Sequence, residues 1–379
     1  MSASGTRREV AIAAPATGLE EWKALREPLE SGWLTQGPKV AEFERRFAEH
    51  HRVDHALATT SCTTALHLAL TTMGIGPGDE VIVPAFTWVA TANVVRFCGA
   101  TPVFADVDVR TYNVDPQDLR RKVSERTRAA IPVHLFGLCA DMDAVREALP
   151  AGTLLLEDAA CAAGAALHGT PAGGLGDAAA FSFHPRKVIT TGEGGMLTTR
   201  DGALAARARV LRDHGASVSE EQRHQGSHPY LMPDFDESGF NYRMTDLQGA
   251  VGLVQLPKLD GFVAERDRWA RWYGEQLSEL GWLRTPEVPE GHDHAWQAYV
   301  AVVDEDAPLP RDVLMARLQD AGIATRPGTH AVTELGAYRA HAGSCPVARR
   351  LQEQTMALPL HNRMTPEDFE YVVDELRRV

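Results

Sequence analysis

At 379 residues, the chain is long enough to form one large domain or two. Its hydrophobic content of 44% and charged content of 23% are typical of a soluble globular protein, and its formal net charge of -13 argues against nucleic acid as the main partner. No apolar stretch reaches the roughly 20 residues of a membrane helix, and five scattered cysteines without a C-x-x-C pair suggest reduced thiols in the cytoplasm rather than a disulfide framework or a structural zinc site.

Short apolar segments alternate with helix-like segments between about residues 55 and 200. The apolar segments are HALATT (55–60), EVIVPAF (80–86), TPVFADV (101–107), AAIPVHLF (129–136), TLLLEDAA (153–160) and AAAFSF (178–183). Their alternation with helices predicts an α/β fold with a large, mostly parallel sheet covered by helices on both faces. Ligands of such sheets bind beyond the carboxyl ends of the strands, so we expect the polar residues that follow these segments to converge.

The segment SCTTALHLAL (61–70) places small hydroxyl residues at the start of a predicted helix. The free backbone N–H groups and the positive end of the helix dipole make such a start a ready site for an anion. Serine and threonine are also the commonest helix caps, so a purely structural role is the alternative.

Trp88 and Asp158 each follow a predicted strand. A buried core aromatic is the usual role of such a tryptophan, and a helix cap or an ion pair between domains is the usual role of such a carboxylate. The alternative is that both side chains face a ligand at the ends of the strands.

Lys187 lies in SFHPRKVITTGEGG (182–195), where a strand-like segment gives way to a polar, glycine-rich one. Only 5 of the 38 basic residues are lysines, so an exposed cation of this chain is usually an arginine. Lysine can lose its proton and act as a nucleophile or a base, which arginine cannot. An ordinary surface lysine is the alternative.

The pattern changes beyond residue 240. Helical periodicity over about ten turns, interrupted near Pro257, predicts a long connecting helix pair. AWQAYVAVV is then a predicted strand, and RDVLMARLQDAG and PEDFEYVVDELRRV are predicted helices. We expect a large domain with an N-terminal arm over residues 1–250, and the connecting helix with a smaller C-terminal α+β domain over residues 251–379.

Familiar nucleotide and metal motifs are missing. The sequence has no G-x-G-x-x-G after a strand, no G-x-x-x-x-G-K-[ST] and no H-E-x-x-H. His292 and His294 have no plausible third ligand nearby, so we expect no metal site. A nicotinamide-dependent sugar oxidoreductase, which would need the glycine fingerprint, is therefore disfavoured.

The candidates together match the needs of pyridoxal phosphate. Its aldehyde requires an amine, its ring nitrogen an acid, its ring an aromatic cover and its phosphate backbone donors. Lys187, Asp158, Trp88 and the helix start at residue 61 would supply these groups.

Several spaced motifs resemble, in order, those of the DegT/StrS family of sugar aminotransferases. They are SGWLTQGPKVAEFE, GIGPGDEVIVPAFTWVATANVV, EDAACAAGA, SFHPRKVITTGEGG and NYRMTDLQGAVGLVQL, with GTHAV (328–332) further on. The resemblance implies a fold-type-I pyridoxal-phosphate enzyme that aminates nucleotide-linked keto-sugars.

The resemblance also implies roles for single residues. Lys187 would form a Schiff base with the cofactor and act as the general base, Asp158 would pair with the ring nitrogen, and Trp88 would stack on the ring. The cofactor phosphate would be held by Cys62, Thr63 and Ser182, and by Asn241 of the neighbouring subunit. Cys161 would lie beside the phenolic oxygen of the cofactor, and His184 and His330 would line the sugar side. A homodimer with shared active sites follows from the role of Asn241. Many members of the family have Gln or His in place of Cys161, and Gly is frequent in place of Cys62. Some relatives with His in place of the lysine are dehydratases, so Lys187 argues against that branch.

The implied reaction moves an amino group from L-glutamate to a ketone. KVITTGEGG resembles members that act on 4-keto sugars, whereas members acting on 3-keto sugars more often have a KNLGALGDGG-like segment. We therefore expect a nucleotide-linked 4-keto-6-deoxy sugar as the acceptor. The alternatives are a 3-keto-sugar or cyclitol aminotransferase of the same family, and a non-catalytic regulator, which would be expected to lack Lys187 or Asp158.

Overall fold

The central sheet has the strand order β1-β10-β9-β6-β5-β2-β4 in the computed structural model, which describes residues 8–218, 230 and 232–379. β10 runs antiparallel to β1 and β9, and the pairs from β9 to β4 are parallel. The strands are β1 (His55–Thr59), β2 (Glu80–Pro84), β4 (Thr101–Ala105), β5 (Thr127–Ala130), β6 (Leu154–Asp158), β9 (Ala178–Ser182) and β10 (Gly195–Thr199). The predicted mostly parallel sheet is confirmed.

Five of the six predicted apolar segments contain a strand of this sheet, but the segment 129–136 overlaps β5 only at residues 129 and 130, because the strand begins earlier and ends sooner than predicted. β5 ends at Ala130, and a 3-10 turn, η1 (Leu135–Gly137), occupies the end of the segment. Pro132 has no N–H to donate to a neighbouring strand, which explains the early end. β10 was not predicted, because its glycine-rich approach resembles a loop.

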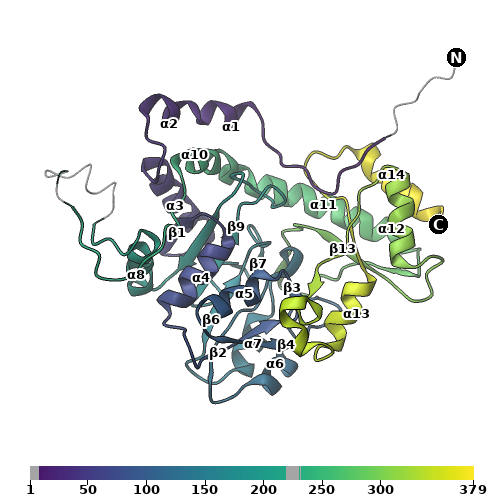
Figure 1. Ribbon diagram of the computed structural model, residues 1–379. Helices are drawn as coiled ribbons and strands as arrows, with labels where there is room; N and C mark the ends of the chain where they lie inside the picture. The colour runs from purple at the N-terminus through teal and green to yellow at the C-terminus, as the bar shows by residue number, and fades with distance from the viewer. Residues whose placement is uncertain (1–7, 219–229, 231) are drawn as a thin grey trace.

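Helices cover both faces of the sheet (Figure 1). Alternate strand residues belong to different hydrophobic clusters: Leu57 belongs to the cluster that includes residues of α4 and α8, and Ala56 and Ala58 belong to the cluster that includes residues of α3 and α7. The helices of this region are α1 (Leu19–Ala24), α2 (Arg26–Ser31), α3 (Pro38–His51), α4 (Cys62–Thr72), α5 (Ala90–Phe97), α6 (Pro116–Lys122), α7 (Met142–Ala148), α8 (Gly202–Arg212) and α10 (Asp246–Gln255). The two-faced cover buries the sheet and leaves its strand ends for ligands.

A long helical stretch connects the sheet to the C-terminal part and runs below α1 and α2 in the view of Figure 1. α10 passes through a short 3-10 turn, η2 (Leu256–Lys258), into α11 (Leu259–Leu277), so the predicted interruption near Pro257 is confirmed. The expected domain division at residue 250 falls inside α10 and stays a prediction.

The C-terminal part forms its own small antiparallel sheet in the order β11-β13-β15. A third hydrophobic cluster joins this sheet to α11, α12 and α14, and also takes in Val10 of the N-terminal arm. The elements are β11 (Leu283–Arg284), β13 (Tyr299–Val303), α12 (Arg311–Asp320), η3 (Val332–Glu334), η4 (Gly336–His341), α13 (Pro346–Gln354), β15 (Thr355–Leu358) and α14 (Pro366–Arg377). Among the described helices, none is both long and apolar enough to cross a membrane.

Short strand pairs link the two parts. β14 (His330–Ala331) of the C-terminal part pairs with β3 (Phe86–Thr87), which follows β2 of the central sheet. β12 (His292–Asp293) pairs with β7 (Ala166–Leu167), which pairs in turn with β8 (Thr170–Pro171). These pairings carry C-terminal residues to the strand ends of the central sheet.

Candidate active site

The start of α4 is shaped to receive an anion. Ser61 caps the helix: its hydroxyl accepts a hydrogen bond from the Thr64 amide at 3.2 Å, and the Thr64 hydroxyl accepts one from the Ser61 amide at 3.0 Å. The next amides, those of Cys62 and Thr63, have no hydrogen-bond partner among the described residues. They are free to donate to a phosphate at the positive end of the helix dipole.

Ser182 lies close to this helix start because of the strand register. It is paired with Gly195 of β10, and Gly195 is paired with Thr59, just before the cap of α4. A Cβ at Gly195 would lie 2.3 Å from the carbonyl carbon of Ser61, so the close approach requires glycine. The Ser182 hydroxyl accepts only a long 3.4 Å bond from the His184 amide within the described chain, and its proton remains available.

Asp158, at the end of β6, is buried with 5% of its surface exposed. The Thr91 hydroxyl donates to its Oδ2 at 2.8 Å, and the Ala160 amide donates to its Oδ1 at 3.2 Å. Burial raises the pKa of Asp158, and these hydrogen bonds and the Lys187 charge oppose the rise. A buried carboxylate held in this way is suited to accept a hydrogen bond from a protonated ring nitrogen.

Thr91 was missed by the sequence analysis. It lies on the first turn of α5 and is fully buried, with its hydroxyl 3.3 Å from that of Thr87. In the sequence it resembles any helix threonine, and only the packing of α5 against the end of β6 gives it a role.

Lys187 lies in a bend after β9, where its amide donates to the His184 carbonyl at 2.8 Å. Its amine donates to the Cys161 sulfur at 3.1 Å. The Lys187 charge lowers the pKa of Asp158 and also acts on the Cys62 thiol, whose pKa burial raises well above its usual value. The structure therefore brings together four of the predicted residues: Cys62, Asp158, Cys161 and Lys187.

Trp88 is 61% exposed, so the alternative of a buried core aromatic is wrong. Its ring centroid lies 5.6 Å from that of His330, with the planes at 45°. The pairing of β3 with β14 brings about this contact, because His330 is opposite Thr87. Both rings are exposed and could cover a bound ligand.

His184 and Asn241 are less closely tied to this cluster. His184 is half-buried, its Nδ1 accepts a hydrogen bond from the Arg186 amide at 3.2 Å, and burial lowers its pKa. Asn241 is exposed in a short bridge to Asp213, and within the described residues its side chain has no hydrogen bond to the Lys187 cluster. Its predicted reach into a neighbouring subunit remains a prediction.

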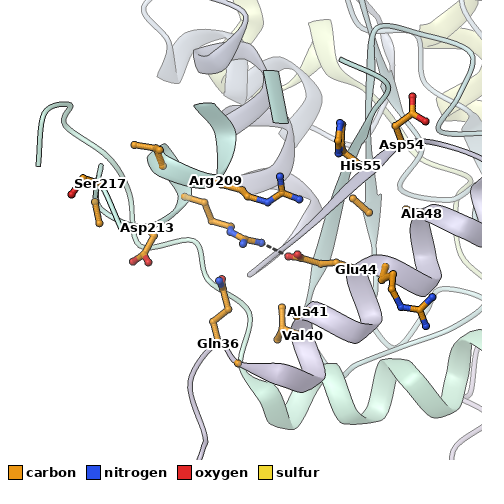
Figure 2. A pocket seen from close by; sticks show the side chains of 16 residues that line it. Gln36, Val40, Ala41, Glu44, Ala48, Asp54, His55, Arg209, Asp213 and Ser217 are labelled. Atoms are coloured by element: carbon orange, nitrogen blue, oxygen red, sulfur yellow. Dashed lines mark hydrogen bonds and ion pairs between the residues drawn. The ribbon is translucent and has the colours of Figure 1, made fainter. Parts of the chain in front are cut away.

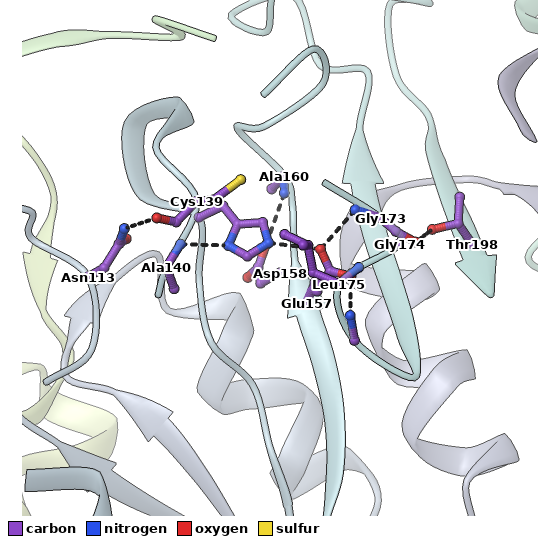
Figure 3. Close-up of polar contacts among 12 residues, drawn as sticks. Asn113, Cys139, Ala140, Glu157, Asp158, Ala160, Gly173, Gly174, Leu175 and Thr198 are labelled. Atoms are coloured by element: carbon purple, nitrogen blue, oxygen red, sulfur yellow. Dashed lines mark hydrogen bonds and ion pairs between the residues drawn. The ribbon is translucent and has the colours of Figure 1, made fainter. Parts of the chain in front are cut away.

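A buried polar network supports β6 on the side opposite Asp158 (Figure 3). Glu157 accepts hydrogen bonds from the amides of Gly173, Leu175 and Gly176 at 2.6–2.8 Å and contacts His134 Nε2 at 2.9 Å. His134 Nδ1 accepts from the Ala140 amide, so its proton is on Nε2 and points to Glu157. Consecutive strand residues point to opposite faces, so the network holds the strand that carries Asp158.

A surface hollow between α3 and α8 is separate from this cluster (Figure 2). An ion pair between Arg212 and Glu44 crosses it. None of the site residues predicted from the sequence lines it within the described chain. Lys187 and Asp158 therefore lie outside this hollow.

Comparisons with known proteins identify the family to which the chain belongs. The model of the DegT/DnrJ/EryC1/StrS aminotransferase family matches residues 15–377. The chain is 41% identical over 375 residues to GDP-perosamine synthase of Caulobacter vibrioides, covering 98% of each chain. Among solved structures, it superposes with a TM-score of 0.89 on the aminotransferase TlmJ of Streptoalloteichus hindustanus, at 35% identity, covering 97% of this chain and 98% of that one. The protein Spr1654 of Streptococcus pneumoniae, at 27% identity and 98% coverage of each chain, gives TM-scores of 0.92 in its PMP form and 0.91 in its PLP form.

Proposed function

Since the chain belongs to the DegT/DnrJ/EryC1/StrS aminotransferase family, we propose that it transfers an amino group from L-glutamate to a nucleotide-linked 4-keto-6-deoxy sugar. The observation that carries this proposal is the convergence of the Lys187 amine, the buried Asp158 carboxylate and the free amides at the start of α4. A non-catalytic regulator would not need this set of groups.

Pyridoxal phosphate is the cofactor indicated by the family and by the PLP and PMP forms of the Streptococcus pneumoniae neighbour. The residues present fit it: the Cys62 and Thr63 amides and Ser182 would hold the phosphate, Asp158 the ring nitrogen, and Trp88 one face of the ring. When bound, the cofactor supplies an aldehyde for the amine and a ring that draws off negative charge from the reacting carbon.

Lys187 has two tasks in this proposal. Its amine would bond to the cofactor aldehyde, and once displaced by the donor it would move a proton from the donor's alpha carbon. The amine donates a hydrogen bond to the Cys161 sulfur at 3.1 Å. Its charge acts on Asp158, but it forms no ion pair with a carboxylate among the described residues.

Asp158 would keep the ring nitrogen protonated. The carboxylate is buried, and the hydrogen bonds from Thr91 and Ala160 fix its orientation. A positive partner at the ring nitrogen would offset the cost of burying the carboxylate charge. The charge pairing would thus stabilise the loaded protein while activating the ring.

The choice of acceptor rests on two observations. The segment KVITTGEGG, which begins at Lys187, resembles that of members acting on 4-keto sugars. The relative from Caulobacter vibrioides is named for a product linked to GDP, which supports a nucleotide-linked acceptor. His184 and the paired rings of Trp88 and His330 would line the sugar side.

A homodimer with shared sites completes the proposal. Asn241 is exposed and would reach the phosphate held by the partner. Leu19, Trp22 and Leu29 on α1 and α2 are 60–70% exposed, and such apolar side chains on adjacent helices suit contact with a second copy of this chain. We place the reaction in the cytoplasm, where thiols such as the five unpaired cysteines stay reduced.

A panel of nucleotide-linked keto-sugars tests the proposal. Purified protein with pyridoxal phosphate and L-glutamate is incubated with 3-keto and 4-keto sugars linked to several different nucleotides. The products are identified by mass spectrometry. Replacement of a ketone oxygen by an amino group in a 4-keto-6-deoxy sugar is the expected result. Amination of 3-keto sugars alone would overturn the assigned position, and no amination of any sugar would overturn the proposed activity.

A further inference from the structure

Gln255, the last residue of α10, joins the lysine bend (residues 183–191) to the N-terminal arm. Its side chain is buried, with the residue 1% exposed, and its Oε1 accepts a hydrogen bond from the Thr190 amide at 3.3 Å. Its Nε2 donates to the Ala16 carbonyl at 3.0 Å and to Glu21 Oε1 at 2.8 Å. Both N–H groups and the oxygen of this side-chain amide are therefore used, which fixes its orientation.

Glu21, on α1, holds the other end of this network. Its carboxylate accepts a hydrogen bond from the Gly18 amide at 2.7 Å and forms an ion pair with Lys258 at 2.6 Å. Burial opposes the charge of Glu21, but the bonds from Lys258, Gln255 and the backbone lower its pKa to about 2. An ionised carboxylate only accepts hydrogen bonds, so Gln255 must turn its N–H groups toward Glu21 and its oxygen toward Thr190.

Thr190 fastens the base of the lysine bend. Its hydroxyl donates to the Phe183 carbonyl at 2.7 Å, and the Thr191 amide donates to the same carbonyl at 3.0 Å. Lys187 lies in the middle of the bend that these bonds close. The Thr190 amide has no acceptor other than Gln255 within the described chain, and a buried donor without an acceptor is costly. The position of the bend therefore depends on Gln255.

The N-terminal arm carries this network to the C-terminal part of the molecule. α1 packs beside α10, as Figure 1 shows. Before α1, Val10 pairs with Ile323, and the Thr17 carbonyl accepts a hydrogen bond from Arg363. Gln255 is thus the point at which the arm, α10 and the lysine bend meet.

We infer that Gln255 is a positioning residue for Lys187 and is itself held in place by the docked N-terminal arm. The inference rests on the proposed function, because it concerns the amine to which that proposal assigns the chemistry. Among the described residues, the Gln255 side chain hydrogen-bonds only to Thr190, Ala16 and Glu21, so its effect passes through the backbone of the lysine bend. A displacement of about 1 Å at a reacting group costs about a hundredfold in rate.

Hydrogen exchange of the purified holoprotein, followed by mass spectrometry of its peptides, tests the first part of the inference without turnover. Gln255→Leu keeps the bulk of the side chain and removes its hydrogen bonds. Exchange in the lysine bend should become about tenfold faster, because the Thr190 amide loses its acceptor, and exchange in β13 should not change. Gln117→Leu, at an exposed glutamine of α6, is the matched control and should change neither.

Glu21→Ala removes the partner that holds Gln255 from the side of the arm. It should speed exchange in the lysine bend by a smaller factor than Gln255→Leu, and it carries the test if melting curves show that Gln255→Leu is not folded. Unchanged exchange in the bend, or equal acceleration in the bend and in β13, would overturn the inference.

A swap of the two side chains separates positioning from a purely structural anchor of the arm. Gln255→Glu places two carboxylates together, and Glu21→Gln in the same chain restores a donor opposite an acceptor. The readout is the rate at which L-glutamate removes the visible band of the holoprotein. The limiting rate should fall about tenfold in Gln255→Glu and recover most of this loss in the double variant, while the half-saturating glutamate concentration changes less than twofold.

An unchanged limiting rate in Gln255→Glu, no recovery in the double variant, or a change confined to the half-saturating concentration would overturn the positioning role. The two proposals can fail separately. A protein that aminates no sugar can still show the exchange difference in the lysine bend, and an active aminotransferase can lack it.

Discussion

Asp158 holds a carboxylate where burial opposes its charge. Its pKa is raised by burial, and the Lys187 charge and two hydrogen bonds offset this only in part. In the absence of a cationic ligand, the pKa of this carboxyl is higher in the folded state than in the unfolded state. At a pH between these two pKa values, the folded state therefore binds more protons than the unfolded state. Its stability therefore falls as the pH rises from the unfolded pKa near 3.8 through the folded one.

Asp158→Asn should remove this loss in the cofactor-free protein. We expect the variant to melt at a higher temperature than the unaltered protein at pH 7, with the difference shrinking toward pH 4, because both then carry a neutral group. Melting curves across this pH range measure the effect. Asp306→Asn, at an exposed aspartate, is the control and should show no such trend. A difference independent of pH would contradict the assignment of the effect to ionisation.

The residues of the candidate site were predictable to different degrees. Lys187, Asp158 and Cys62 stand next to predicted strands or helices, so their convergence followed from the topology of the sheet. Thr91 was not predicted, because nothing in its local sequence marks it. Its position depends on how α5 packs against the end of β6.

At the level of elements, the approach of β10 to α4 determines the shape of the anion site. Gly195 has no space for a side chain, since a Cβ there would lie 2.3–2.6 Å from backbone atoms of Ser61 and Cys62. β10 was not predicted because its sequence begins with glycines. The same glycines allow β10 to approach the start of α4.

Gly195→Ala should displace the start of α4. We expect a loss of about 1–3 kcal/mol in the free energy of unfolding, typical of overpacking, and weaker binding of pyridoxal phosphate. Denaturant unfolding and titration of the cofactor-free protein measure the two effects. Gly261→Ala on α11, where a Cβ meets nothing within 4 Å, should instead stabilise the helix slightly. Equal effects of the two substitutions would contradict the proposed contact.

The loop after β8 is tied to β6 through Glu157. Glu157→Ala would leave the buried amide of Gly173 and the half-buried amides of Leu175 and Gly176 without their acceptor, so we expect a loss of about 3 kcal/mol or more in unfolding free energy. Glu157→Gln keeps a carbonyl oxygen and should lose less. Glu305→Ala, at an exposed position, should change little. Denaturant unfolding compares the three, and a loss in Glu157→Ala no larger than in the Glu305 control would contradict the network's role.

Prediction of the elements succeeded where sequence periodicity was strong. The six apolar segments and the helix pair around Pro257 follow directly from spacing. The two-residue strands β3 and β14 have no such signal, yet their pairing places His330 against Trp88. Contacts between short segments that are far apart in the sequence depend on the tertiary packing of the whole chain and could not be derived from local sequence.

For the whole molecule, the proposal of shared sites makes Asn241 act in the partner subunit. Lys187→Ala and Asn241→Ala should each be inactive or nearly so as pure dimers. When the two are unfolded together and refolded, mixed dimers have one site with both residues intact, and about a quarter of the original activity should return. Light scattering checks the dimer mass. Activity that stays at the level of the separate variants would contradict the shared site.

The central claim is that the Lys187 amine performs the amino transfer. The visible absorption of the holoprotein, followed while L-glutamate is added without a sugar, tests it most directly. We predict that the band disappears as the cofactor takes up the amino group, that a keto-sugar restores it, and that Lys187→Ala loaded with pyridoxal phosphate shows no such loss. A band that glutamate leaves unchanged in the unaltered protein, or bleaches equally in Lys187→Ala, would contradict the account.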